Sequence, residues 1–191
     1  MKNKSFLFNL LFLFLWQVSF AQQTILSDSN LPIMLISTDI DPDTNTPTDI
    51  PDEPKVLANM RLIYRPDGTR NYLTDSTNES FLNYKGRIGI ELRGSSSQAL
   101  DKKPYGFTTL LDDDDSNNNV SLLGMPSEND WVLNSLAYDP SMIRDYLSYT
   151  LASNTGNYAP RVAYIEVIVN GDYKGVYFLT EKVKRDSDRV N

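Results

Sequence analysis

A short serine-rich segment with basic residues on both sides is the part of this sequence best suited to chemistry. In chain order it contains Arg93, Gly94, Ser95, Ser96, Ser97, Lys102 and Lys103. Backbone amides and hydroxyls at a bend after a strand form a concavity for phosphate oxygens, and flanking cations add positive charge. The same pattern also fits a polar hairpin loop that needs no ligand. A phosphate site and a plain loop are therefore the two interpretations of this segment.

The two lysines cannot serve the same purpose. Lys102 and Lys103 are adjacent, so in an extended chain their side chains point to opposite faces. Only one of them can reach a phosphate, and we expect Lys103 to be that residue. The competing interpretation leaves both ammonium groups in solvent with only their aliphatic stems packed.

The composition removes several classes of enzyme. The chain has no His and no Cys, which excludes a Ser-His-Asp triad, a thiol nucleophile and any zinc site built on imidazole or thiolate. Carboxylates, hydroxyls, lysines and arginines remain, and these groups suit magnesium, calcium and phosphate. The formal net charge of −7 argues against a nucleic-acid partner, whose phosphates require a basic face.

Residues 1–21 have the pattern of a secretory signal peptide. Lys2 and Lys4 precede an apolar run over residues 6–16, and small residues lead to a cleavage point after Ala21. The run is shorter than the roughly 20 residues that span a bilayer, so we expect no stable membrane anchor. The predicted location is secreted, periplasmic or cell surface.

Residues 22–56 predict an exported N-terminal strand and a linker. The apolar run 31–36 is typical of a buried strand, whereas 39–54 is acidic and rich in proline, which cannot sustain a strand ladder. The linker begins like a calcium loop. However, Thr44 stands where such a loop needs Gly, and Ile50 stands where it needs Glu, so we favour a solvated linker without a metal.

The remainder, residues 57–191, predicts one α+β domain in which a twisted antiparallel sheet carries one main packed helix. Apolar or alternating runs predict strands at 56–64, 85–93, 105–111, 162–169 and 173–180. Asn170 and Gly171 predict a tight turn between the last two strands. Apolar residues recur every three or four positions from Met142 to Leu151, which predicts an amphipathic helix that Gly156 ends.

Several motifs together resemble the CotH kinase family, the relatives of spore coat protein H. The motifs are 93–97 (RGSSS), 102–105 (KKPY), 122–126 (LLGMP), 130–131 (DW), Arg144 and 175–191 (GVYFLTEKVKRDSDRVN). The resemblance implies an atypical protein kinase fold that binds ATP and magnesium and phosphorylates protein side chains. The smaller lobe of such a kinase is a twisted antiparallel sheet with one helix. This sequence departs from the family at two loop positions, because family members often have Asn at the position of Ser95 and Ser at that of Pro104.

The resemblance also implies roles for single residues. The implied ATP-binding set is Arg93, Gly94, Ser95, Ser96, Ser97, Lys102, Lys103 and Glu181. Glu181 enters it because the chain leaves the last strand there, where a kinase crosses between its lobes. The family's catalytic and metal-binding acids are expected beyond Asn191, in a C-terminal lobe that this chain lacks, so no catalytic or metal-binding residue is assigned.

The sequence therefore supports two hypotheses about function. The first is the nucleotide-binding half of a secreted CotH-like kinase that transfers the ATP γ-phosphate to a protein substrate. The second is a non-catalytic cell-surface or coat-like module of the same fold. Whether this chain is itself an enzyme stays open between them.

Overall fold

The computed structural model describes residues 25–185 and 189–190. The predicted signal peptide, residues 1–21, lies outside the described residues. The elements, in chain order, are β1 (Asp28–Ser29), β2 (Ile33–Thr38), β3 (Val56–Ile63), β4 (Asn71–Tyr72), the 3-10 helices η1 (Leu73–Thr77) and η2 (Glu79–Phe81), β5 (Leu82–Leu92), the 3-10 helix η3 (Ser96–Ala99), β6 (Tyr105–Leu110), β7 (Asp130–Asn134), α2 (Arg144–Asn154), β8 (Val162–Val169) and β9 (Asp172–Glu181).

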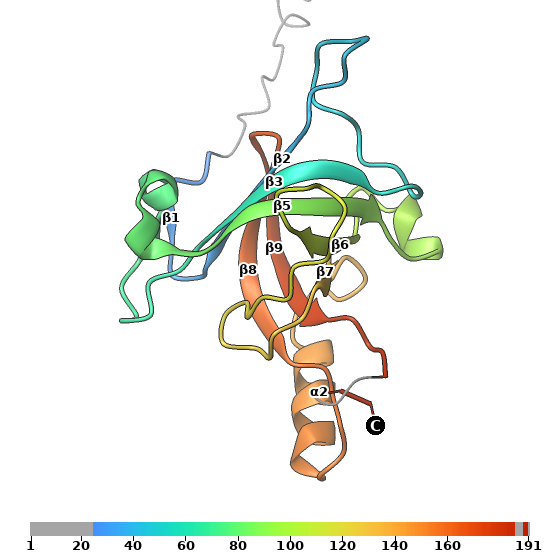
Figure 1. Cartoon of the computed structure of the whole chain (residues 1–191). Helices are drawn as coiled ribbons and strands as arrows, with labels where there is room; N and C mark the ends of the chain where they lie inside the picture. Colours follow the sequence, from blue (N-terminus) through green and yellow to red (C-terminus); the bar gives the residue numbers. More distant parts are fainter. Residues whose placement is uncertain (1–24, 186–188, 191) are drawn as a thin grey trace, which may run out of the picture.

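Seven of these strands form a closed barrel in the order β2-β3-β5-β6-β7-β9-β8 (Figure 1). Neighbouring strands are antiparallel except β2 and β8, which pair in parallel with Ile33 opposite Glu166. That pairing joins an early strand to a late one and closes the barrel. The short strands β1 and β4 form a separate two-stranded sheet.

The predicted α+β layout, a sheet covered by a packed helix, is wrong. The described chain is mostly β, with a closed barrel and a single α-helix. An open sheet must cover its apolar face with another element, whereas a barrel turns that face inward, so no helix is required as a cover. Figure 1 shows α2 extending beyond the barrel, next to the start of β8.

The helix is correspondingly exposed. None of its residues is buried, and the side chains of Leu147 and Leu151 are 49% and 64% exposed. It contacts the barrel through Tyr146, whose ring stacks on Tyr164 with centroids 5.9 Å apart. The apolar spacing predicted the position of the helix, but the helix does not contribute to the core.

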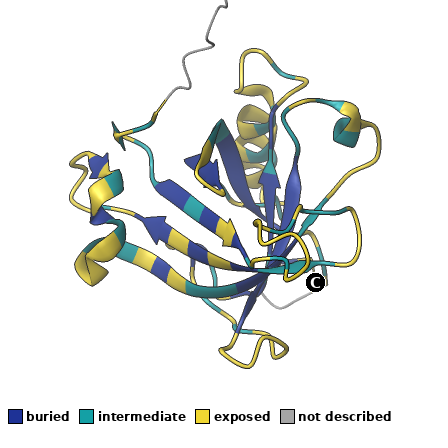
Figure 2. Cartoon of the chain, turned by 90° about the horizontal axis from the view of Figure 1, so that it is seen from above, coloured by how far each residue is buried: buried dark blue, intermediate teal, exposed yellow. Residues whose placement is uncertain are grey.

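The interior of the barrel is filled by side chains from alternate positions of its strands. On β5, Ile88 and Ile90 are fully buried, whereas Arg87 and Glu91 lie on the outer face. Figure 2 shows buried and exposed residues alternating along the strands. The predicted strand over 85–93 is confirmed within β5, and its alternation separates the core from a charged outer surface.

The predicted hairpin at the end of the barrel is confirmed. Strands β8 and β9 are antiparallel, and Val169 pairs with Asp172 across a two-residue turn. Asn170 and Gly171 have φ values of 51° and 80°, which are the positive angles that this turn requires.

Candidate functional site

The serine-rich segment lies in the loop that joins β5 to β6. Gly94 has a φ of 91°, and a Cβ at this position would lie 2.2 Å from Ser97 Oγ, so glycine is required here. The 3-10 helix Ser96–Ala99 follows directly. Ser95 and Ser96 are exposed, so the loop is accessible to a ligand.

Both lysines after this loop bind backbone carbonyls. Lys102 donates from Nζ to the carbonyl of Val176 and lies 4.6 Å from the centre of the Tyr177 ring. Burial lowers the pKa of Lys102. Lys103 donates from Nζ to the carbonyl of Gln98 at 2.6 Å, which ties the loop to itself. In this conformation both ammonium groups hold the loop in place.

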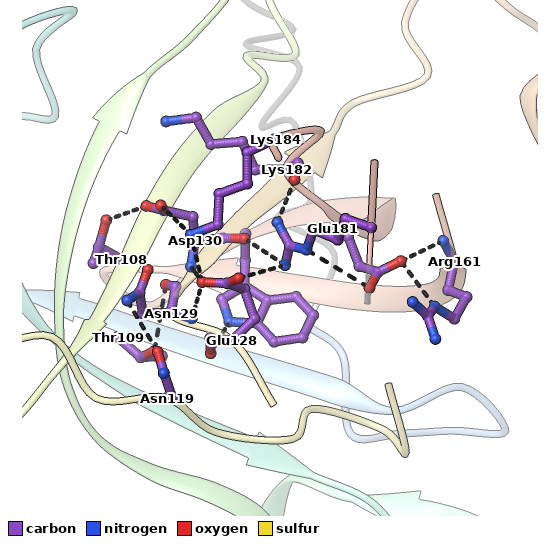
Figure 3. A network of polar contacts seen from close by, with 12 residues as sticks. Thr108, Thr109, Asn119, Glu128, Asn129, Asp130, Arg161, Glu181, Lys182 and Lys184 are labelled. Atoms are coloured by element: carbon purple, nitrogen blue, oxygen red, sulfur yellow. Dashed lines mark hydrogen bonds and ion pairs between the residues drawn. The ribbon is translucent and has the colours of Figure 1, made fainter. Parts of the chain in front are cut away.

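Glu181 is the last residue of β9 and lies in a buried polar network (Figure 3). Arg161 donates two hydrogen bonds to Glu181 Oε2, one from its backbone nitrogen at 2.8 Å and one from Nε at 3.0 Å. Arg189 Nε lies 3.9 Å from the other carboxylate oxygen, Oε1. The next residue, Lys182, is exposed on the outside of the barrel.

A pocket of about 100 Å³ on the outer face of β5, β6 and β7 gathers charged side chains from several parts of the chain. Its lining residues are Lys55, Glu91, Arg93, Gly106, Phe107, Asp130, Trp131, Val132 and Lys182. We call it the cationic pocket. Gly106 keeps it open towards β5, because a Cβ there would lie 3.4 Å from Glu91 Oε1.

A chain of polar contacts connects the acids and lysines of this face. Lys55 Nζ lies 2.6 Å from Thr108 Oγ1 and 3.9 Å from Glu91 Oε1. The Thr108 hydroxyl donates to Asp130 Oδ1 at 2.9 Å. Lys184 approaches the other carboxylate oxygen of Asp130 at 3.2 Å (Figure 3). Each acid of the pocket is therefore paired with a lysine.

The electrostatics of the pocket leave net positive charge. Burial alone would raise the pKa of Asp130, but hydrogen bonds from Thr108 and Lys184 outweigh it, and the pKa lies below its usual value. Asp130 is therefore ionised at neutral pH. Within residues 25–185 and 189–190, the side chains of Arg93 and Lys182 make no hydrogen bond or ion pair. Two cations at this pocket are thus available to an anion.

The sequence predicted only part of this arrangement. Arg93 was among the predicted ATP-binding residues and lines the pocket. The pocket is also lined by Lys55 and Asp130, which the sequence did not suggest for ligand binding. The alternation along β5 predicts that Glu91 points outward. Lys55 lies between the proline-rich segment 39–54 and β3, where no alternating pattern predicts which strand its side chain lies beside.

The described part of the chain has neither a cluster of metal ligands nor a membrane-spanning helix. Among the described residues, no group of three or more acidic side chains lies close enough to hold a metal ion. None of the described helices has the length and apolar content needed to cross a membrane.

Comparisons with known proteins agree with the family indicated by the sequence motifs. The family model described as CotH kinase protein matches residues 90–191, which include the serine-rich loop, Asp130 and Lys182. No curated protein matches the chain. Because the family model covers more than half of its length, this chain belongs to the CotH kinase family.

Proposed function

We propose that this chain is the nucleotide-binding part of an exported protein kinase and that its cationic pocket holds phosphate groups of ATP. Two facts support the proposal. The chain belongs to the CotH kinase family, and Arg93 and Lys182 line one pocket while their side chains make no hydrogen bond or ion pair within the described residues. Phosphoryl transfer requires mainly positioning and positive charge around the phosphates. The unpaired cations are the observation that carries the proposal.

The size of the pocket limits what it can hold. At about 100 Å³ it is far smaller than the roughly 300–1,000 Å³ of sites that enclose a whole small ligand. It suits a phosphate group, with the rest of the nucleotide extending along the outer face. Arg93 provides a guanidinium that can bind two phosphate oxygens, and Lys182 adds a point charge.

The described residues do not fit a magnesium site by themselves. Magnesium prefers several oxygen ligands in octahedral geometry, and no acidic cluster of the required size is present in the described ranges. Glu91 and Asp130 are both engaged by lysines. We therefore assign phosphate binding alone to these residues and derive no step through the metal. ATP, when bound, supplies the γ-phosphoryl group for a protein acceptor.

Equilibrium binding of ATP, with and without magnesium, tests this assignment. We expect Arg93→Gln and Lys182→Gln each to weaken ATP binding about tenfold, because each removes a charged hydrogen bond to a phosphate. Arg70→Gln is the matched control, since the Arg70 side chain is 54% exposed, pairs with Asp28 and does not line the cationic pocket. It should bind ATP like the wild type.

A second variant separates the pocket from the serine-rich loop. Lys103→Gln removes the lysine that the sequence favoured, and an effect confined to Lys103 would move the phosphate site to the loop. Absence of ATP binding in the wild type would refute the proposal. Nucleotide binding without phosphate transfer to any protein would favour the alternative, a non-catalytic surface or coat-like module.

A further inference from the structure

A second pocket, of about 470 Å³, lies on the outer faces of β2, β3 and β8. It is lined by Ile25, Leu26, Leu35, Ile36, Ser37, Asn59, Arg61, Leu73, Ile168, Gly171 and Tyr173. We call it the β2–β3 pocket. It shares no residue with the cationic pocket, so what it binds is independent of the function proposed above.

The floor of the β2–β3 pocket is apolar. Leu35 and Leu73 pack against a small buried cluster outside the main core, formed by Ile33, Ile63 and Ile168. Leu35 is only partly buried because its outer side faces the pocket. The floor therefore offers apolar surface to a ligand rather than to another element of the described chain.

The wall of the pocket on β3 is polar. Leu35 pairs with Arg61 across the two strands, and Ser37 pairs with Asn59, so all four residues share the outer face. In the described part of the chain, the side chains of Ser37, Asn59 and Arg61 make no hydrogen bond or ion pair. A guanidinium, an amide and a hydroxyl thus lie together beside an apolar floor.

The charge of the lining selects the kind of ligand. Arg61 is the single charged residue among those that line the pocket. The nearby carboxylate of Glu166 accepts hydrogen bonds from Ser29 at 3.0 Å and from Tyr173 at 2.6 Å. The available charge is positive, which favours an anionic group beside Arg61.

We propose that the β2–β3 pocket binds an amphiphile with one carboxylate at the end of an unbranched apolar chain. The volume lies within the roughly 300–1,000 Å³ typical of small-molecule sites. The carboxylate binds Arg61 in a bidentate manner, with Asn59 and Ser37 as further donors. The apolar chain covers Leu35, Leu73 and the exposed edge of the cluster below them.

Binding of n-decanoate to the purified full chain, measured by titration calorimetry, tests the proposal, with n-decanol as the uncharged probe. Arg61→Gln should weaken decanoate binding about tenfold and leave decanol binding unchanged, because only the carboxylate uses the guanidinium. Leu35→Thr should weaken both probes, because it removes apolar floor while keeping a residue suited to a strand.

Lys85→Gln is the matched control. Lys85 lies opposite Arg61 on the neighbouring strand β5 but does not line the β2–β3 pocket. It should bind decanoate like the wild type. Circular dichroism and urea unfolding establish that each variant is folded before its affinity is compared.

Three results would overturn the proposal. The first is no decanoate binding by the folded wild type. The second is equal decanoate affinity in Arg61→Gln and wild type. The third is an equal loss in Lys85→Gln, which would mean that general positive charge, rather than this pocket, attracts the ligand. All of these outcomes are independent of ATP binding.

Discussion

Glu128 allows the sharpest test of the buried network that supports the cationic pocket. Its side chain is 7% exposed and accepts a hydrogen bond from Lys184 at 2.7 Å, with Arg189 at 3.6 Å. The Arg189 side chain is itself only 2% exposed. Glu128→Gln keeps the shape of the side chain but leaves both cations with less negative charge around them.

The contacts of Glu128 determine how much stability Glu128→Gln should lose. Removing one partner of a buried ion pair costs about 3–5 kcal/mol. In Glu128→Gln, Lys184 still has Asp130 as an ion-pair partner at 3.2 Å, and Arg189 still has Glu181 at 3.9 Å. These remaining acids reduce the expected loss in the free energy of unfolding to about 2–3 kcal/mol. With a urea dependence of about 2 kcal/mol/M, the midpoint should fall by about 1–1.5 M.

Glu79→Gln is the control for this measurement. Glu79 pairs with Lys85 at 2.6 Å, but the two side chains are 72% and 50% exposed. Exposed pairs contribute only about 0–1 kcal/mol, because solvent screens them and the side chains lose freedom. Urea unfolding followed by circular dichroism should therefore separate the two variants. Equal midpoints for both would refute the argument that burial makes the Glu128 pair important.

The pH dependence provides a second check on Glu128. Burial alone would raise the pKa of this carboxyl, but hydrogen bonds from Lys184 and the Asn129 amide, with the charge of Arg189, lower it below 4.5. A carboxyl with a lowered pKa in the folded state stabilises the fold above its unfolded pKa, and this contribution is lost as pH falls through the folded value. The difference between wild type and Glu128→Gln should thus be full at pH 7 and shrink below about pH 4.5. A difference that is independent of pH would contradict the ionised pair.

Two further predictions concern the loop and the helix. In urea unfolding, Gly94→Ala should lower the free energy of unfolding more than Gly68→Ala. Both glycines have positive φ, but a Cβ at position 94 would lie 2.2 Å from Ser97 Oγ, whereas a Cβ at position 68 would have no atom within 4 Å. Equal losses would contradict the packed loop. Leu151→Glu should change the free energy of unfolding by less than about 0.5 kcal/mol, because Leu151 is 64% exposed and contributes nothing to the core. A loss of several kcal/mol would mean that the helix packs against the barrel.

Local patterns in the sequence predicted the local structure well. The turn at Asn170 and Gly171 needs positive φ at both positions, and few other residue pairs supply it at low cost. The alternation through β5 fixes which side chains face inward, because a shift by one residue would expose Ile88 and Ile90. Such features depend on neighbours in the chain, so they can be read from the sequence.

Closure of the barrel could not be predicted in the same way. It depends on the parallel pairing of β2 with β8, where Ile33 lies opposite Glu166. No local signal specifies a partner so distant in the chain, and an apolar run such as 31–36 fits an open sheet equally well. The wrong prediction of a packed helix has the same cause. Apolar spacing in a helix indicates a buried face only where an open sheet is available to pack against, and the closed barrel leaves none. The place of Lys55 in the cationic pocket was equally unpredictable, because it depends on contacts with Glu91 and Thr108, which are distant in the chain.

Barrel closure also determines where this protein can bind ligands. The main cluster fills the interior with buried side chains, among them Phe107, Trp131 and Tyr177, so ligands must bind outside. The alternation that places Ile90 in this core places Glu91 on the outer face, and the strand leads into Arg93 at its end. A one-residue insertion between Ile90 and Glu91 would therefore leave most of the β5 core intact and still move the acid and the arginine away from the cationic pocket. If ATP binding depends on that pocket, the insertion should abolish binding at a modest cost in stability, whereas a ligand held by β2 and β3 should be unaffected.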